Sequence, residues 1–242
     1  MNLDQAFDLT IDGECPICAA PVTFRAQNSW LRDHLFCSGC ISIPRERATM
    51  LVIEECRPDW RALAIHEGSP DTRRGASAKL AAECPLYVGS QFYPACPLGS
   101  MKNGFRIEDL ERQTFPSESF DLVVTQDVME HVFQPDTVYR EIWRTLRPGG
   151  LYIHTTPIYA GLIKSERWAE RKAGLVFHIK GPEYHGNPID EAGSLVTFHF
   201  GYDLPQLITT WTPFDVELRR YQDRRHGILG EFTDVLICRK SD

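Results

Sequence analysis

The 242-residue sequence lacks the features that would place the protein in a membrane or on a nucleic acid. No apolar run reaches the roughly 18 residues that a membrane-spanning helix needs. The acidic start, MNLDQAFDLTIDGE, shows no signal-peptide pattern. The net charge of −7 leaves no surplus of positive charge for neutralising phosphates. We therefore expect a cytoplasmic protein with no membrane partner and with nucleic acid disfavoured; the oligomeric state stays open.

The chain is also poor in glycine at a place where nucleotide-binding folds are usually rich in it. The segment LAIHEGSPDTRRGASAKL, Leu63 to Leu80, follows an apolar stretch and contains only Gly68 and Gly75. The G-x-G-x-G turn that brings backbone close to a bound nucleotide is absent. A ligand at this turn must therefore be held by groups other than a phosphate-cradling loop.

Four of the eight cysteines form two C-x-x-C pairs near the start of the chain. These are Cys15 with Cys18 and Cys37 with Cys40, a spacing typical of a zinc ribbon. Four thiolates leave the metal no open position, so the expected Zn²⁺ is structural rather than catalytic. Positive and negative side chains are balanced around the ribbon, which gives it no electrostatic footprint for a nucleic acid. A small stabilising unit, helping to cover a substrate pocket, is the favoured interpretation.

The rest of the chain alternates between short apolar strands and helices. Seven strands are expected, near residues 62–66, 86–90, 105–107, 120–125, 151–155, 214–220 and 233–238. This alternation predicts an α/β, Rossmann-like, doubly wound and mostly parallel sheet, with ligands at the carboxyl ends of the strands. The predicted domains are a zinc ribbon at 1–42, a connecting helix at 43–61 and the sheet domain at 62–242, with a substrate-cover insertion at 158–201.

One stretch of the sheet domain carries a family resemblance. It reads EDLERQTFPSESFDLVVTQDVMEHVFQPDTVYREIWRTLRPGGLYIHTTP. Asp109 lies six residues before the Phe of FPSESFD, and the EH pair and LRPGG follow at the expected intervals. The stretch resembles the class I S-adenosylmethionine-dependent methyltransferases, in the broad group that includes the ubiquinone-biosynthesis O-methyltransferases. The resemblance implies an enzyme that binds S-adenosylmethionine.

The resemblance also implies a set of cofactor-binding residues at the ends of neighbouring strands. Asp109 would accept a hydrogen bond from the adenine amino group, although an Asp here could instead cap a helix. The second strand lacks the usual acid for the ribose, so Ser90 or Gln91 would replace it. The small residues from Gly75 to Ser77 would open a helix N-terminus to the cofactor's carboxylate. The expected set is Glu67, Gly68, Ser69, Ser90, Gln91, Asp109, Leu110 and Gln126.

His131 and Asp127 are the candidate catalytic residues. In the ubiquinone-type enzymes, acids and a histidine at matching positions are associated with a divalent metal, so Asp127, Glu130 and His131 are the candidate ligands of a Mg²⁺ ion. The alternative for His131 is a structural hydrogen bond. The reaction would be an in-line attack on the sulfonium methyl, with the protein supplying alignment and a dry pocket.

The acceptor would lie under the insertion. Its candidate contacts are Tyr184, His185, His199 and His178, with Asn187 beside them. Basic clusters near 164–180 and 219–225 favour an anionic acceptor or are simply solvated. The leading hypothesis is O- or N-methylation of a small molecule such as a sugar or secondary metabolite. The alternatives are a catalytically inactive binding or scaffold protein and an RNA or protein methyltransferase guided by the ribbon.

Overall fold

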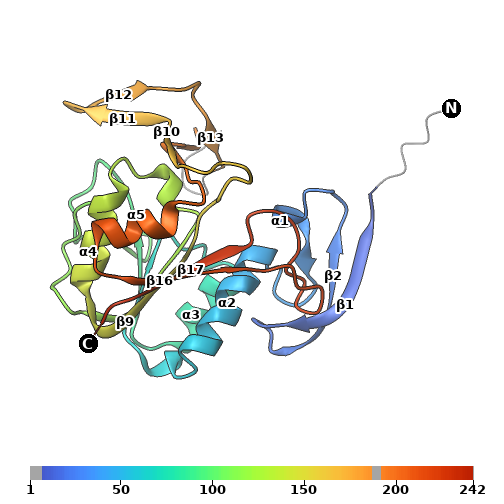
Figure 1. Cartoon of the computed structure of the whole chain (residues 1–242). Helices are drawn as coiled ribbons and strands as arrows, with labels where there is room; N and C mark the ends of the chain where they lie inside the picture. The colour runs from blue at the N-terminus through green and yellow to red at the C-terminus, as the bar shows by residue number, and fades with distance from the viewer. Residues whose placement is uncertain (1–6, 187–191, 242) are drawn as a thin grey trace.

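A computed structural model describes residues 7–186 and 192–241 of the chain. Figure 1 shows three parts: a central twisted sheet, a small β unit beside it, and a hairpin that projects away from the sheet at the top of the view. The central sheet has eight strands in the order β16-β17-β9-β8-β4-β5-β7-β6. Their bounds are β4 (Ile65–Gly68), β5 (Tyr87–Gln91), β6 (Met101–Lys102), β7 (Phe105–Ile107), β8 (Phe120–Gln126), β9 (Leu146–Thr155), β16 (Asp215–Arg220) and β17 (Asp234–Arg239).

The Rossmann-like fold is confirmed, with one strand more than the seven expected. Strands β4, β5, β7, β8 and β9 run parallel, whereas β17 pairs antiparallel with both β9 and β16. The extra strand, β6, is two residues long and pairs antiparallel with β7. It lies in the short connection between β5 and β7, where the structure has no crossover helix. Strand β4 begins at Ile65, later than expected, because Trp60–Ala62 forms a short 3₁₀ turn, η1.

Helices cover both faces of the sheet. Strand residues alternate between the faces: Leu122 and Val124 join one buried cluster, and Val123 between them joins the other. The first cluster contains residues of α2 (Pro44–Cys56) and α3 (Gly75–Glu83). The second contains residues of α4 (Pro135–Thr145) and α5 (Leu204–Trp211). The helix expected to be a connector, α2, is therefore one of the helices that cover the sheet.

The N-terminal unit is a three-stranded antiparallel sheet with one short helix. It contains β1 (Leu9–Cys15), β2 (Ala20–Ala26), α1 (Leu31–His34) and β3 (Phe36–Cys37). The loop between β16 and β17 reaches out from the central sheet to meet it (Figure 1). There the Glu14 N–H donates to the Arg225 carbonyl at 2.9 Å, and the two side chains form an ion pair at 2.8 Å. The ribbon is thus held by both α2 and this loop.

The insertion after β9 is built of short strand pairs. Strands β11 (Ala169–Lys172) and β12 (Leu175–His178) form the projecting hairpin (Figure 1). The remaining strands are β10 (Glu166–Arg167), β13 (Tyr184–His185), β14 (Ser194–Leu195) and β15 (Phe198–His199). Strand β10 pairs with β15, and β13 pairs with β14. Among the described residues, no helix is long and apolar enough to cross a membrane.

One buried arginine joins the three parts that meet around the ribbon. Arg47 of α2 is fully buried and donates hydrogen bonds to the carbonyls of Ser42, of Leu35 at 2.9 Å and of Gly227 at 2.6 Å. Its guanidinium lies 4.6 Å from the ring centroid of Phe24 in β2. Burial lowers the pKa of Arg47 to about 10, so the group stays charged at neutral pH. The charge is stabilised by three carbonyl dipoles from different segments.

We expect the Arg47→Ala variant to lose about 3 kcal/mol or more of the free energy of unfolding, because three buried carbonyl oxygens lose their donor. Urea unfolding followed by circular dichroism measures the loss. Arg140→Ala is the matched control: its exposed pair with Asp136 at 2.7 Å contributes about 0.5 kcal/mol or less. Equal losses in the two variants would contradict the role given to Arg47.

Candidate functional site

The four ribbon cysteines converge as a closed metal site requires. The sulfur atoms of Cys15 and Cys40 lie 3.7 Å apart, as do those of Cys18 and Cys37, and all four lie within 4.8 Å of one another. Zn–S bonds of about 2.3 Å in a tetrahedron place sulfur atoms about 3.8 Å apart. The Gly39 N–H donates to the Cys37 sulfur at 3.3 Å, and a side chain at Gly39 would collide with Cys18. The cluster fits a small zinc site.

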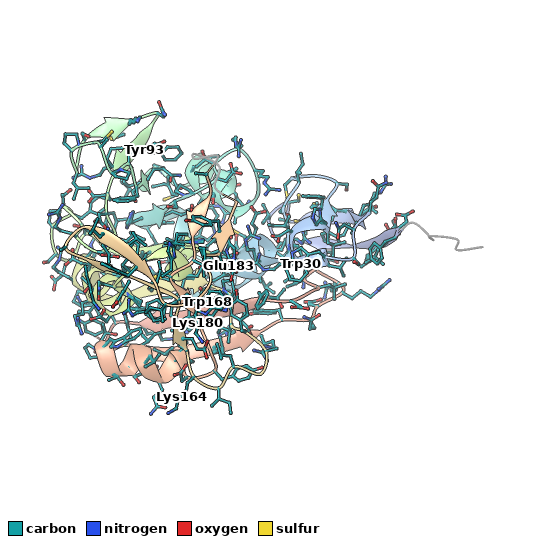
Figure 2. All side chains as sticks on the ribbon, turned by 90° about the horizontal axis from the view of Figure 1, so that it is seen from above. Trp30, Tyr93, Lys164, Trp168, Lys180 and Glu183 are labelled. Carbon is teal, nitrogen blue, oxygen red and sulfur yellow. The ribbon has the colours of Figure 1, made fainter. Side chains whose placement is uncertain are left out.

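The main cavity has a volume of about 1100 Å³ and lies at the carboxyl ends of β4, β5 and β8. Its walls come from four parts of the chain: the sheet, the ribbon with α2, the insertion, and the β16–β17 loop. Trp30 of the ribbon and Glu183 of the insertion both contribute to the wall, and Figure 2 shows them on the same side of the molecule. The ribbon therefore lines the cavity, which is consistent with the expectation that it helps to cover a pocket.

Glu67, the next-to-last residue of β4, lines the cavity. Its carboxylate accepts hydrogen bonds from Ser77 Oγ at 2.6 Å, Tyr87 Oη at 2.9 Å and Gln126 Nε2 at 3.3 Å. No arginine or lysine is among these partners. Burial therefore raises the pKa of Glu67 to about 7. The carboxyl is positioned but not neutralised, so a cationic group placed beside it would be stabilised.

The turn after β4 compensates for its missing glycines. Ser69 takes a left-handed backbone conformation, with φ of 56°, and its N–H donates to the Ser90 carbonyl at 2.8 Å. The Gln91 amide donates to the Pro70 carbonyl at 3.1 Å, which fixes the turn against β5. The Ser90 hydroxyl is turned toward the buried His66, 2.8 Å away. Ser90 and Gln91 thus stabilise the turn while also lining the cavity.

Of the predicted cofactor residues, the cavity wall contains Glu67, Ser69, Ser90, Gln91, Asp109, Leu110 and Gln126. Gly68 lies behind the wall, where a side chain would press on Leu110 and Thr125. Asp109 Oδ1 accepts the Glu111 N–H at 2.9 Å in a turn. In the described chain no helix begins there, so the helix-cap alternative for Asp109 is wrong.

A residue outside the predicted set lies at the start of α3. The Glu46 carboxylate contacts Gly75, at the helix N-terminus that was expected to take a ligand's carboxylate. Glu46 also accepts the Ile43 N–H at 2.9 Å, and burial raises its pKa. A carboxyl group of the protein itself therefore lies against this helix terminus. In the sequence, Pro44 followed by Glu46 indicates the start of a helix, but it does not indicate that Glu46 lies against Gly75.

Asp127 follows directly after β8, and its charge is neutralised by two arginines from α1 and α2. Arg32 of α1 and Arg45 of α2 both form ion pairs with its carboxylate, and Thr155 donates to it at 2.9 Å. Although burial opposes this, the Arg45 and Arg32 charges hold the pKa of Asp127 below its ordinary value. Such a carboxylate is a poor base and a poor metal ligand. The Mg²⁺ set of Asp127, Glu130 and His131 is therefore not supported.

Glu130 and His131 follow Asp127 closely in the chain, but neither of them forms an ion pair or hydrogen bond with an arginine in the described residues. The Thr156 hydroxyl donates to Glu130 Oε2 at 2.9 Å, whereas the buried Oε1 has no hydrogen-bond partner. Burial, with the nearby Asp127 charge, raises the pKa of Glu130 to about 7. His131 Nδ1 lies 2.9 Å from the Leu195 carbonyl, and burial lowers its pKa. His131 therefore does make a structural hydrogen bond, yet its other nitrogen remains available.

The predicted acceptor contacts are dispersed. His185 lines the cavity, 5.2 Å from the ring of His131. His199 stacks on Trp168, 3.8 Å away, and contacts Glu183 at 2.9 Å. Tyr184 is exposed on β13, and His178 is exposed on the β11–β12 hairpin. Asn187 lies outside the described residues. Glu183, Tyr159 and Phe232 line the cavity but were not predicted.

The comparisons with known proteins agree with this fold. Residues 92–154 match the family described as "Methyltransferase domain". A Mesorhizobium loti S-adenosylmethionine-dependent methyltransferase has the same fold, with 16% identity, a TM-score of 0.52 and coverage of 80% of this chain and 98% of that one. Among curated proteins, no sequence match was found.

Two further solved structures are similar in fold. The Burkholderia thailandensis 1,6-didemethyltoxoflavin-N1-methyltransferase, with its substrate and S-adenosylhomocysteine bound, has 15% identity, a TM-score of 0.51 and coverage of 82% and 79%. A Haloferax volcanii protein solved with the Trm112 methyltransferase activator has 12% identity, a TM-score of 0.50 and coverage of 82% and 90%. The chain has the fold of the S-adenosylmethionine-dependent methyltransferases. More particularly, its residues 92–154 are similar to the methyltransferase domain family.

We expect the purified protein to carry about one zinc ion per chain, measured by atomic emission, since four thiolates complete a tetrahedral site. Cys18→Ser removes one thiolate and should reduce the zinc content to near zero and lower the thermal midpoint. Cys96→Ser, outside the cluster, is the control and should change neither. Full zinc occupancy in Cys18→Ser would rule out the cysteine cluster as the binding site.

Proposed function

We propose that this protein transfers a methyl group from S-adenosylmethionine to a small-molecule acceptor held in the main cavity. The observation that carries the proposal is the cavity itself. A single cavity contains the predicted cofactor residues Glu67 and Asp109 and also Glu130 and His185, and residues of the ribbon and the insertion line it as well. Pockets for single small ligands usually measure about 300–1000 Å³. A cavity of about 1100 Å³ has room for a nucleoside cofactor and a small acceptor together.

The chemistry of the first end fits the cofactor. The buried Gln126 Oε1 has no hydrogen-bond partner, and the Glu67 carboxylate beside it has no cation. Both are suited to the cofactor's ammonium group, while Asp109 at the cavity wall is suited to the adenine amino group. When bound, S-adenosylmethionine supplies the electrophilic methyl group. The chain's own residues would orient it and keep water away from the acceptor.

The cavity charges argue against a strongly anionic acceptor. Arg32 and Arg45 are paired with Asp127, and Arg171 is paired with Glu111 at 2.9 Å. In the basic cluster at 219–225, Arg219, Arg220 and Arg225 are likewise paired, for example Arg220 with Asp234 at 2.7 Å. These cations are already compensated, so we favour a neutral polar acceptor. The inward direction of Arg32 and Arg45 also leaves the ribbon less suited to guiding an RNA.

A second candidate is a binding or scaffold protein that has lost catalysis. The observation that favours it is that the Glu46 carboxyl lies against Gly75, at a helix N-terminus suited to the cofactor's carboxylate. If the protein still binds S-adenosylmethionine, Arg74, which lines the cavity nearby, would have to bind the cofactor's carboxylate in place of the helix N-terminus.

We expect wild-type protein to bind S-adenosylhomocysteine in isothermal titration calorimetry. Asp109→Ala should weaken binding about tenfold, because one hydrogen bond to the adenine is lost. Asp136→Ala, on the exposed face of α4, is the control and should bind normally. No binding by the wild-type protein would favour the scaffold candidate.

Binding should also release a proton near pH 7. Free Glu67 is about half protonated there, because its pKa is raised to about 7, and an adjacent ammonium group would favour the charged form. Affinity should therefore increase between about pH 6 and pH 8. Calorimetry in two buffers of different ionisation enthalpy measures the release. Glu67→Gln should abolish it and Glu130→Gln should not; unchanged release in Glu67→Gln would exclude Glu67 as its source.

A further inference from the structure

Three unused ligand atoms converge in the acceptor half of the cavity. They are Glu130 Oε1, His131 Nε2 and His185 Nδ1, which all lie within 4.8 Å of one another. Glu130 Oε1 is 3.8 Å from His131 Nε2 and 4.0 Å from His185 Nδ1. These separations are too long for hydrogen bonds, which would bring the atoms to about 3 Å.

The hydrogen bonds made by the other atoms of these residues fix the protons. His131 Nδ1 lies 2.9 Å from the Leu195 carbonyl, which can only accept, so Nδ1 carries the proton. His185 Nε2 lies 3.1 Å from Glu183 Oε1, so its proton is on Nε2. Glu130 Oε2 is taken by Thr156. In the neutral imidazoles, both remaining nitrogens therefore present lone pairs toward Glu130 Oε1.

Three lone pairs facing one another repel unless a cation lies between them. Glu130 is 1% exposed, and its Oε1 has no partner among the described residues, an expensive state for a buried carboxyl oxygen. Neither Arg32 nor Arg45 supplies the cation, because both are directed to Asp127. The outer partners of the two histidines, a backbone carbonyl and a carboxylate, are those that usually orient metal-binding imidazoles.

We propose that Glu130 Oε1, His131 Nε2 and His185 Nδ1 bind one divalent first-row transition metal ion. Two imidazoles and one carboxylate suit iron, manganese, cobalt, nickel or zinc better than Mg²⁺, which prefers oxygen ligands. Three protein ligands leave positions open toward the cavity. The site is separate from the ribbon's cysteine cluster, and it uses His185 of the insertion in place of the neutralised Asp127.

The metal would also define the acceptor class, a step that rests on the proposed function. An acceptor hydroxyl that binds at an open position would release its proton to water as it enters the cavity, because the metal would stabilise the anion. The oxygen lone pair then forms the C–O bond as the C–S bond breaks, and that electron pair stays on sulfur as the thioether. The acceptor is accordingly a hydroxylated small molecule, and the product is a methyl ether.

The test is calorimetric titration of the full chain, with its ribbon zinc in place, by Ni²⁺ alone at pH 7.5. Wild-type protein should bind one Ni²⁺ per chain. Loss of one ligand in His185→Ala or Glu130→Gln should weaken binding at least about 100-fold, beyond the usual effect of an outer-shell change. His178→Ala, a histidine exposed on the same insertion, should bind as the wild type does. Circular dichroism and thermal unfolding verify that the variants fold.

Three results would overturn the site: no Ni²⁺ binding by the wild type, equal binding by His185→Ala, or release of ribbon zinc equal to the Ni²⁺ bound. No cofactor is present in this titration. A failure to bind S-adenosylhomocysteine would therefore count against the proposed function alone. Metal binding without any effect of Ni²⁺ or Mn²⁺ on the binding of hydroxylated acceptors would reject only the acceptor class.

Discussion

The buried guanidinium of Arg47 is the interaction on which the rest of this structure depends. It joins the ribbon, helix α2 and the β16–β17 loop through carbonyls of Leu35, Ser42 and Gly227. A buried cation is unfavourable unless it is hydrogen-bonded, and here both terminal nitrogens of the guanidinium donate to carbonyls, so each of the three segments stabilises the other two. The position of the ribbon relative to the sheet is fixed as a result. Without that position, Arg32 could not reach Asp127.

This constraint makes the ribbon part of the site rather than an appendage. Helix α2 covers the sheet with its apolar face, while its first turn places Arg45 and Glu46 at the mouth of the cavity. A metal in the cysteine cluster would hold β1 and β3 together and so keep α1 in place. The cluster would then affect the cavity only indirectly, through Arg32. Structural metal chemistry and ligand binding would be linked by packing, with no shared ligand.

The sequence was sufficient for the features that depend on local pattern. Cysteine spacing predicted the cluster, apolar alternation predicted the sheet, and the FPSESFD segment placed Asp109 at the cavity. It was insufficient for contacts between distant segments, because periodicity says which face of an element is buried but not against what. Arg32 lies 95 residues from Asp127, and nothing local indicates their ion pair. The same limit hid Glu46 at Gly75 and placed Tyr184 and His178 nearer the cavity than they are.

The cavity contains carboxylates in two contrasting states, and the contrast indicates where ligands belong. Asp127 is neutralised by two arginines, which holds its pKa low and completes its interactions within the protein. Glu67 and Glu130 are as deeply buried but have hydroxyl and amide partners only, and the pKa of each is raised to about 7. Within the described residues, the protein thus supplies cations for one of these buried acids and none for the other two. The carboxylates of Glu67 and Glu130 therefore lack a positively charged partner there. The missing charges would come from bound molecules: an ammonium group at Glu67 and a metal ion at Glu130. Along the chain, Asp127 lies between Gln126, which donates to Glu67, and Glu130. Its two arginines complete its charge, so it would compete for neither cation while both ligands share one cavity.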